Sequence, residues 1–97
     1  MIVVWGSIET IAGKLDEALH LSLEHVHRSR QEPGCISHNV HTDVENGNRL
    51  TFFEEWADMA ALQTHFGVPA SGQFVENISK LAVGPPEMKI FESTLIS

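Results

Sequence analysis

Cysteine and tyrosine are nearly missing from this 97-residue sequence, which has one Cys and no Tyr. Cys35 alone cannot form an intrachain disulfide, and no Cys-x-x-Cys spacing indicates a zinc site. The lack of Tyr excludes acid catalysis by a phenol side chain. No apolar stretch approaches the roughly 20 residues that cross a bilayer, and residues 1–7 lack the basic segment of a signal peptide. We therefore expect a cytoplasmic protein without a membrane partner.

Positive charge is also scarce. Six Lys and Arg residues stand against thirteen Asp and Glu residues, which gives a formal net charge of −7 with His neutral. Such a chain repels phosphate backbones, and it contains no basic run, so we predict no nucleic-acid partner. Hydrophobic residues make up 42% of the chain, which is typical of a folded protein. The length fits a single domain, residues 1–97.

Hydrophobic periodicity and turn residues divide the chain into alternating strands and helices. We expect strands at residues 2–9, 35–43, 49–56 and 88–95, and helices at residues 13–31, 58–66 and 70–82. Asp58 is the expected N-cap of the second helix. Between the two middle strands, the Asn-Gly pair in the turn 45–48 predicts a type I′ hairpin with positive φ.

The order β-α-β-β-α-β, with the second helical part broken in two, is that of the split βαβ or ferredoxin-like fold. We therefore predict an α+β protein with a four-stranded antiparallel sheet and both helical parts on one face. The strands carry apolar residues on both faces, because Ile2 and Val4 alternate with Val3 and Trp5. A bare apolar sheet face predicts a partner, so we expect a homodimer that packs sheet against sheet.

The six histidines raise the question of a metal site. His20 and His27 share a helix face with Glu24, but that face is the polar one, and we interpret it as solvated. His25 borders the apolar stripe of the same helix and is interpreted as a packing residue. His38 and His41 stand three apart on a strand, so they point to opposite faces and cannot bind one ion together. We predict no metal site.

Three polar residues are expected near apolar surroundings. His38 lies on the apolar face of its strand, and Glu54 lies between Phe52 and Trp56 on the same face of the next strand. A pair between Glu54 and a strand histidine is compatible with catalysis or with a purely structural contact. His65 shares a helix face with Ala61 and points between helix and sheet, either as a proton acceptor or as a core residue bonded to a carbonyl.

The segments 32–36 (EPGCI), 53–56 (FEEW), 60–66 (AALQTHF) and 81–87 (LAVGPPE), with the Asn-Gly hairpin, resemble the antibiotic biosynthesis monooxygenase domain family. The resemblance extends over roughly residues 3–92 and implies a dimeric α+β barrel. Glu54 and Trp56 match the Glu-x-Trp of the family, and His65 matches its helical His. His38 stands where an aromatic residue, often Tyr, is common.

Members of this family include cofactor-free quinol and polyketide monooxygenases, haem-degrading proteins and an isomerase of a small phosphorylated signal. The haem-degrading relatives use a helix Trp and, about three turns later, a His ligand. Here His65 and Val75 stand near those positions, so haem degradation is not expected.

The resemblance implies an enzyme that oxidises a small reduced aromatic, a quinol or polyketide-like phenol, with dioxygen and without a cofactor. A deprotonated quinol can itself give electrons to dioxygen, so the protein supplies an apolar pocket, a base and orientation. His65 is the expected base, with His38 as its substitute and Glu54 as an orienting carboxylate. Contacts with the substrate are expected from Trp56, Phe52, Asn39 and His41.

Two other functions remain open at this point. One is an isomerase of the same fold that acts on a small polar metabolite. A phosphorylated substrate would need a cationic anchor, and most of the six Lys and Arg residues map to the ends of helices or strands. The other is a dimeric module that binds a ligand without turnover.

Overall fold

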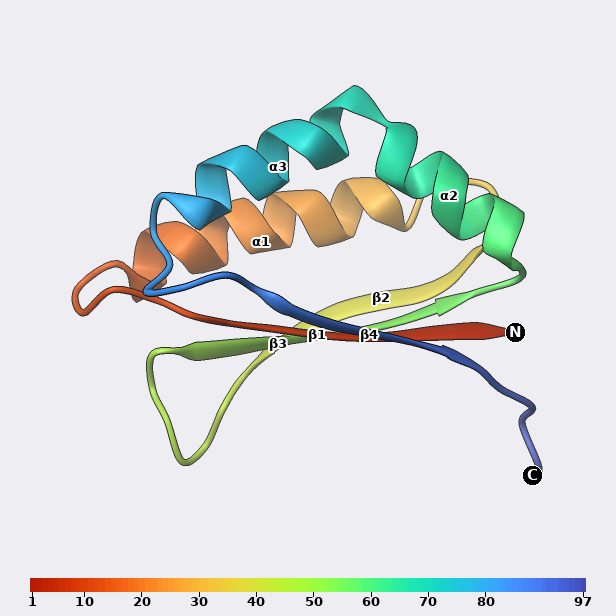
Figure 1. The fold of residues 1–97 in the computed structure, drawn as a ribbon, viewed down its shortest axis with the longest axis horizontal. Helices are drawn as coiled ribbons and strands as arrows, with labels where there is room; N and C mark the ends of the chain where they lie inside the picture. The colour runs from red at the N-terminus through yellow and green to blue at the C-terminus, as the bar shows by residue number, and fades with distance from the viewer.

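The computed structural model describes all of residues 1–97 and contains a single sheet with helices on one of its faces (Figure 1). The elements, in chain order, are β1 (Ile2–Glu9), α1 (Leu15–Ser29), β2 (Cys35–Thr42), β3 (Arg49–Trp56), α2 (Met59–Gly67), α3 (Pro69–Ser79) and β4 (Glu87–Glu92). None of the helices has the length and apolar character that crossing a membrane requires.

The sheet has the strand order β2-β3-β1-β4, and all neighbouring strands are antiparallel. This topology confirms the ferredoxin-like α+β prediction. In the register, Glu54 of β3 lies opposite both Val4 of β1 and His38 of β2. Because directly opposed residues share a face, Glu54 and His38 both point toward the helices.

The apolar core lies between the sheet and the helices, and β3 runs through both of its parts. Phe52 belongs to one buried cluster together with Ile8 and Ile78, and Trp56 belongs to a second cluster together with Leu62. Glu54 stands between Phe52 and Trp56 on the same face of β3. A carboxylate thus occupies the boundary between two apolar clusters, and the polar residues described below gather around it.

Helix α1 is shorter than the predicted span of residues 13–31. It begins at Leu15 because Gly13 has a φ of 86°, which is incompatible with a right-handed helix. Its buried face includes Ser22 and Ser29, whose hydroxyls donate to the carbonyls of Ala18 at 2.7 Å and His25 at 2.6 Å. These bonds satisfy the two hydroxyls inside the protein.

The loop between β2 and β3 differs from the predicted type I′ hairpin. Only Gly13 and Gly34 have positive φ, so Gly47 does not adopt the turn conformation that Asn-Gly suggested. Side-chain oxygens shape the loop instead: Asp43 accepts from the amide of Glu45 at 2.8 Å, and Asn46 accepts from that of Asn48 at 3.1 Å. Such Asx turns close a loop without positive φ.

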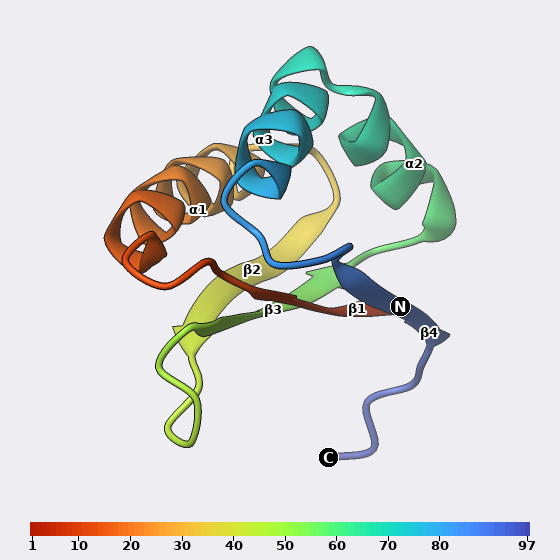
Figure 2. The same cartoon turned by 60° about the vertical axis from the view of Figure 1, so that its left-hand side comes forward.

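Helix α2 approaches the start of β2 at Gly34. A Cβ built on Gly34 would lie 2.5 Å from the Cβ of Ala61, and the φ of Gly34 is 83°. Asp58 caps α2 as predicted, because its carboxylate accepts from the amide of Ala61 at 2.8 Å. The chain then bends at Val68 into α3, which lies beside α1, while α2 lies next to α3 over the end of β3 (Figures 1 and 2).

No helix covers the outer face of the sheet (Figure 2). Trp5 and Phe91 on this face are 46% and 49% exposed. Trp5 packs edge to face against Phe53, with ring centroids 6.1 Å apart. The outer face therefore carries an apolar patch, which we define as Val3, Trp5, Phe53 and Phe91.

Candidate functional site

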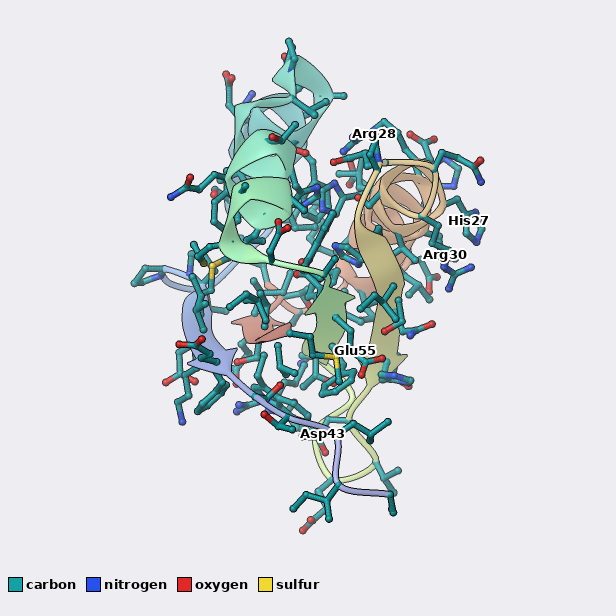
Figure 3. All side chains as sticks on the ribbon, turned by 90° about the vertical axis from the view of Figure 1, so that its right-hand side faces the viewer. His27, Arg28, Arg30, Asp43 and Glu55 are labelled. Atoms are coloured by element: carbon teal, nitrogen blue, oxygen red, sulfur yellow. The ribbon has the colours of Figure 1, made fainter.

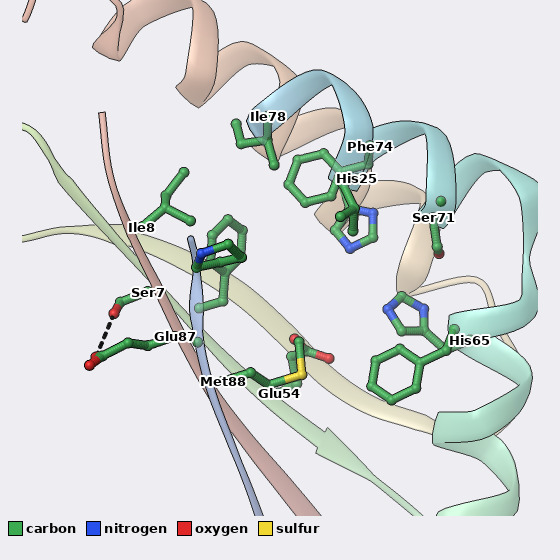
Figure 4. Close-up of a pocket in the computed structure, with 16 residues that line it drawn as sticks. Ser7, Ile8, His25, Glu54, His65, Ser71, Phe74, Ile78, Glu87 and Met88 are labelled. Carbon is green, nitrogen blue, oxygen red and sulfur yellow. Dashed lines mark hydrogen bonds between the residues drawn. The ribbon is translucent and has the colours of Figure 1, made fainter. Parts of the chain in front are cut away.

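A cavity of about 140 Å³ lies between the sheet and the α2–α3 segment, and residues 86–88 form part of its wall (Figure 4). Its wall is largely apolar and includes Phe52, Phe74, Ile78 and Met88. His25, Glu54 and His65 also line it. A cavity of this volume is comparable to those that hold a single benzene ring in other proteins.

Glu54 is buried and anchored to its own strand. Its Oε1 accepts from the indole Nε1 of Trp56 at 2.9 Å and lies 3.2 Å from His38 Nε2. Burial raises the pKa of Glu54, but the contacts with His38, Trp56 and His65 outweigh burial and hold this pKa below its ordinary value. Glu54 is therefore an ionised carboxylate beside the cavity.

His38 is completely buried, and neither of its ring nitrogens has a hydrogen-bond partner. The contact with Glu54 is close enough for a charge interaction but not for a well-directed hydrogen bond. Because both nitrogens are sealed from solvent, His38 has no direct access to the cavity and is not among the residues that line it. It contacts the cavity residues through ring packing, 5.2 Å from His25 and 5.5 Å from His65 between centroids.

His65 extends from α2 into the space between helix and sheet, as the sequence predicted. Its Nδ1 lies 3.0 Å from Glu32 Oε1, and its ring lies 4.6 Å from that of Trp56 between centroids. Burial lowers the pKa of His65 and outweighs the opposing effect of Glu32. A neutral imidazole in this position can accept a proton at neutral pH.

His25 belongs to the site, and its interpretation as a packing residue is incomplete. The ring stacks on Phe74 with a centroid distance of 4.0 Å, and its Nδ1 lies 2.8 Å from Arg28 Nη2. Burial, followed by His38, His65 and Arg28, lowers the pKa of His25 to about 3. His25 is therefore neutral at physiological pH.

An ion pair between Arg28 and Glu32 lies behind the two cavity histidines and was not predicted. Arg28 Nη1 donates to Glu32 Oε2 at 2.9 Å, and Nη2 donates to the hydroxyl of Ser71 at 3.2 Å. Arg28 lies between α1 and the α2–α3 segment, whereas His27 and Arg30 point to the other side of α1 (Figure 3). His25 and Arg28 are three residues apart on α1, and Glu32 follows three residues after its end, so the spacing of 25, 28 and 32 is the sequence signal for this arrangement.

His25, His38 and His65 are the residues that could hold a metal ion. One ring nitrogen of each lies within 4.8 Å of the other two, although the three come from α1, β2 and α2. The guanidinium of Arg28 opposes a cation here, because it occupies Nδ1 of His25 and places a positive charge beside the cluster. The donor set therefore fits proton transfer better than metal binding, and the absence of a metal site remains a prediction.

The expected substrate contacts divide between the two faces of the sheet. Phe52 lines the cavity, and Trp56 packs against His65 without lining it. Asn39 and His41 lie on the outer face, opposite Phe53 and Thr51, and neither lines the cavity. The amide oxygen of Asn39 accepts from Arg30 at 3.0 Å. We therefore correct this expectation: within one chain, Asn39 and His41 do not reach a ligand in the cavity.

Comparisons with known proteins place this geometry in a family. A protein from Synechocystis sp. (strain ATCC 27184 / PCC 6803 / Kazusa), called uncharacterized protein sll1783, is 41% identical over 91 residues, which are 94% of this chain and 62% of that protein. The chain thus spans less than two thirds of that relative. A crystal structure of an antibiotic biosynthesis monooxygenase has a TM-score of 0.90 and 25% identity, covering 98% of this chain and all of the other.

A conserved protein from Methanosarcina mazei Go1 is also similar in structure, with a TM-score of 0.91 and 25% identity over 96% of this chain and 92% of the other. The sequence profile of the family described as antibiotic biosynthesis monooxygenase matches residues 1–77. This match covers most of the chain, including β1–β3, the three helices apart from the end of α3, and all the cavity histidines. The chain belongs to the antibiotic biosynthesis monooxygenase family.

Proposed function

We propose that this protein is a monooxygenase that oxidises a small reduced aromatic compound, a quinol or a phenol, with dioxygen and without a cofactor. The observation that carries this proposal is the position of His65. It is a neutral imidazole beside an apolar cavity, and Glu32 fixes its Nδ1. Family membership supports the same class of reaction.

The proposed reaction begins with removal of a hydroxyl proton from the substrate by Nε2 of His65. The resulting anion is a stronger electron donor than the neutral quinol, and it supplies the electrons that reduce dioxygen. One oxygen atom enters the aromatic ring, and the other leaves as water with two hydrogen atoms from the substrate. The protein therefore needs to supply a base and an environment that orients the ring.

The cavity wall suits a flat apolar ring. Phe52 and Phe74 present aromatic surfaces, and the largely apolar lining excludes water from the reacting anion. The volume of about 140 Å³ is sufficient for one ring. These features support a single-ring quinol as the first substrate to test.

The test is oxygen consumption with methylhydroquinone and with menadiol, each corrected for autoxidation, with ¹⁸O₂ used to follow oxygen into the product. We expect enzyme-dependent uptake and one labelled atom in each product molecule. The His65→Phe variant should be slower by about 100-fold or more, because a general base is removed. The exposed His20 provides a matched control, since His20→Gln should retain the wild-type rate.

Three outcomes are informative in different ways. Uptake that is equal in His65→Phe and wild-type protein would remove His65 from the mechanism. Ligand binding with neither oxygen uptake nor product would support the non-catalytic binding module instead. Product formation without oxygen uptake would indicate an isomerase, although the apolar wall gives this reading little support, since Arg28 is already engaged by Glu32 and Ser71.

We also propose that a second copy of this chain covers the outer face of the sheet. The apolar patch occupies the centre of that face on β1, β3 and β4. Arg49 and Lys89 lie on this face with Glu55 and Glu87, so a two-fold related copy can place opposite charges against each other around the patch.

A further inference from the structure

The Arg28–Glu32 ion pair contacts both cavity histidines, one through each partner. Arg28 Nη2 lies 2.8 Å from His25 Nδ1, and Glu32 Oε1 lies 3.0 Å from His65 Nδ1. A guanidinium can only donate hydrogen bonds, and an ionised carboxylate can only accept them. The same ring atom therefore has opposite roles in the two histidines.

These contacts determine where each neutral ring carries its proton. Nδ1 of His25 accepts from Arg28, so the proton of His25 is on Nε2. Nδ1 of His65 donates to Glu32, so Nε2 of His65 is left with a free lone pair. The ion pair thus makes Nε2 of His25 a hydrogen-bond donor and Nε2 of His65 a hydrogen-bond acceptor.

Both Nε2 atoms are available to a ligand. His25 and His65 line the same cavity, from α1 and α2 respectively (Figure 4). Neither Nε2 has a partner within the chain, and the only buried side-chain nitrogens that are both unpartnered and sealed from solvent are those of His38. The two histidines therefore line the same cavity, each with an Nε2 that no group of the chain engages.

We propose that His25 and His65 form one binding site for a phenolic hydroxyl, in which His65 Nε2 takes the proton and His25 Nε2–H donates to the phenolate oxygen that results. The O–H bond of the ligand breaks, an N–H bond forms on His65, and no electron is transferred in this step. His25 is then a catalytic residue, and Arg28 and Glu32 are positioning residues. This inference takes the class of substrate, a phenol or quinol, from the proposed function, and it takes the roles of the two histidines from the contacts described above.

The spacing of the rings permits a single oxygen to contact both histidines. Their centroids are 5.3 Å apart, and one nitrogen of each lies within 4.8 Å of the other. Two hydrogen bonds of about 2.8 Å that meet at one oxygen span at most about 5.6 Å. Stacking on Phe74, with 7° between the planes, holds the ring of His25 in a fixed orientation.

The groups around the two histidines favour His65 as the proton acceptor and His25 as the hydrogen-bond donor, and they disfavour the reverse assignment. Burial and the neighbouring His38, His65 and Arg28 keep the pKa of His25 at about 3, so His25 does not compete for the proton. The carboxylates of Glu32 and Glu54 both favour positive charge on His65. An imidazole that donates to a developing oxyanion without being protonated is a known catalytic arrangement.

The first test uses 4-nitrophenol, whose absorption spectrum distinguishes its neutral and ionised forms. We expect wild-type protein to bind it as the anion at a pH where it is mainly neutral in solution. His25→Phe, which retains stacking on Phe74, should weaken binding of the anion about 10- to 100-fold. Binding of 4-nitroanisole, which has no hydroxyl, should change less than about threefold, and His27→Phe is the control variant.

The second test reads the protonation of each ring directly from ¹⁵N chemical shifts of histidine-labelled protein. We expect His25 to carry its proton on Nε2 and His65 on Nδ1. Arg28→Met should release His25 into a mixture of the two forms, and Glu32→Gln should do the same for His65. A merely structural role for the ion pair would leave both assignments unchanged in any variant that folds.

Some outcomes would overturn the inference while leaving the proposed function intact. These are a proton on Nδ1 of His25, nitrophenol bound in its neutral form, or an equal loss of affinity for both ligands in His25→Phe. Conversely, phenolate binding and ring protonation as expected, with no oxygen uptake from any quinol, would contradict only the monooxygenase reaction. Both tests use the intact chain and require no turnover.

Discussion

His25 illustrates how burial sets the charge state of a histidine. The side chain is 7% exposed, it stacks on Phe74, and its Nδ1 accepts from the permanently charged Arg28. A second positive charge at this place would lose hydration and face a guanidinium at short range. The ring is therefore held neutral by its position in the fold.

This charge state predicts a pH dependence of stability. Unfolded His25 takes up a proton near pH 6.5, whereas the folded ring resists protonation until about pH 3. Between these values the unfolded state binds more protons, so the free energy of unfolding should fall as the pH is lowered. One such group contributes a slope of at most about 1.4 kcal/mol per pH unit.

Urea denaturation of wild-type protein and His25→Phe between pH 7 and 4 measures this contribution. The variant should show a shallower pH dependence, even if its stability at pH 7 is lower. His27→Phe, a substitution on the exposed side of the same helix, is the matched control. Parallel profiles for wild-type protein and His25→Phe would contradict the prediction.

The individual site residues differ in how far the sequence predicts them. Strand alternation places Glu54 among Phe52 and Trp56, and helical spacing directs His65 inward, so both positions follow from periodicity. The role of His25 does not, because it depends on the contact of Arg28 with Glu32 and with Ser71 from α3. The contact with Ser71 joins residues 43 apart in the sequence, and a helical wheel shows only that His25 borders an apolar stripe.

At the scale of elements, the first three strands are predicted more accurately than the helices and loops, whereas β4 is found at Glu87–Glu92 and the sequence predicts residues 88–95. The bounds of β1 and β3 match the prediction, since apolar residues that favour strands recur along both segments. Helix α1 begins two residues later than predicted because of the φ of Gly13. The β2–β3 loop was mispredicted because Asp43 and Asn46 form local side-chain bonds that compete with an Asn-Gly turn.

The contact between α2 and the start of β2 predicts an unequal response of two glycines to substitution. Gly13 and Gly34 have φ values of 86° and 83°, but only Gly34 would place a Cβ against a neighbour, Ala61. Gly13→Ala should therefore cost about 1 kcal/mol of unfolding free energy from backbone strain alone. Gly34→Ala should cost about 2–4 kcal/mol, since α2 must also shift.

Chemical denaturation of both variants checks this difference. The displacement of α2 should also lower oxygen uptake in Gly34→Ala, because α2 carries His65. Equal destabilisation of the two variants would show that the close approach of α2 to Gly34 does not hold in solution. Gly47→Ala, at a position with neither positive φ nor a close neighbour, serves as the reference.

For the whole molecule, the outer apolar patch predicts an association that a single substitution can break. Trp5→Glu places a charge at the centre of the patch, so the variant should sediment as a single subunit at low micromolar concentration, where wild-type protein should sediment as a dimer. Val44→Glu is the control, because Val44 is fully exposed in the β2–β3 loop and away from the patch.

Sedimentation of wild-type protein as a stable single subunit at that concentration would contradict the proposed dimer. The same result for Val44→Glu as for Trp5→Glu would show that added charge, and not the patch, controls association.

The order of strands and helices was sufficient to predict the fold, because few topologies satisfy the rules of connection. The sequence alone did not show which face of the sheet packs against the helices. The register of His38 against Glu54 was needed to decide this.

Strand β4 forms one edge of the sheet. It pairs only with β1, all of its residues are exposed, and Met88 and Glu87 form part of the cavity wall. Fraying this edge breaks a few backbone bonds but removes no helix from the core. Ligand entry at this edge would require β4 to separate from β1, whereas His25 and His65 are carried by α1 and α2 and do not depend on that pairing.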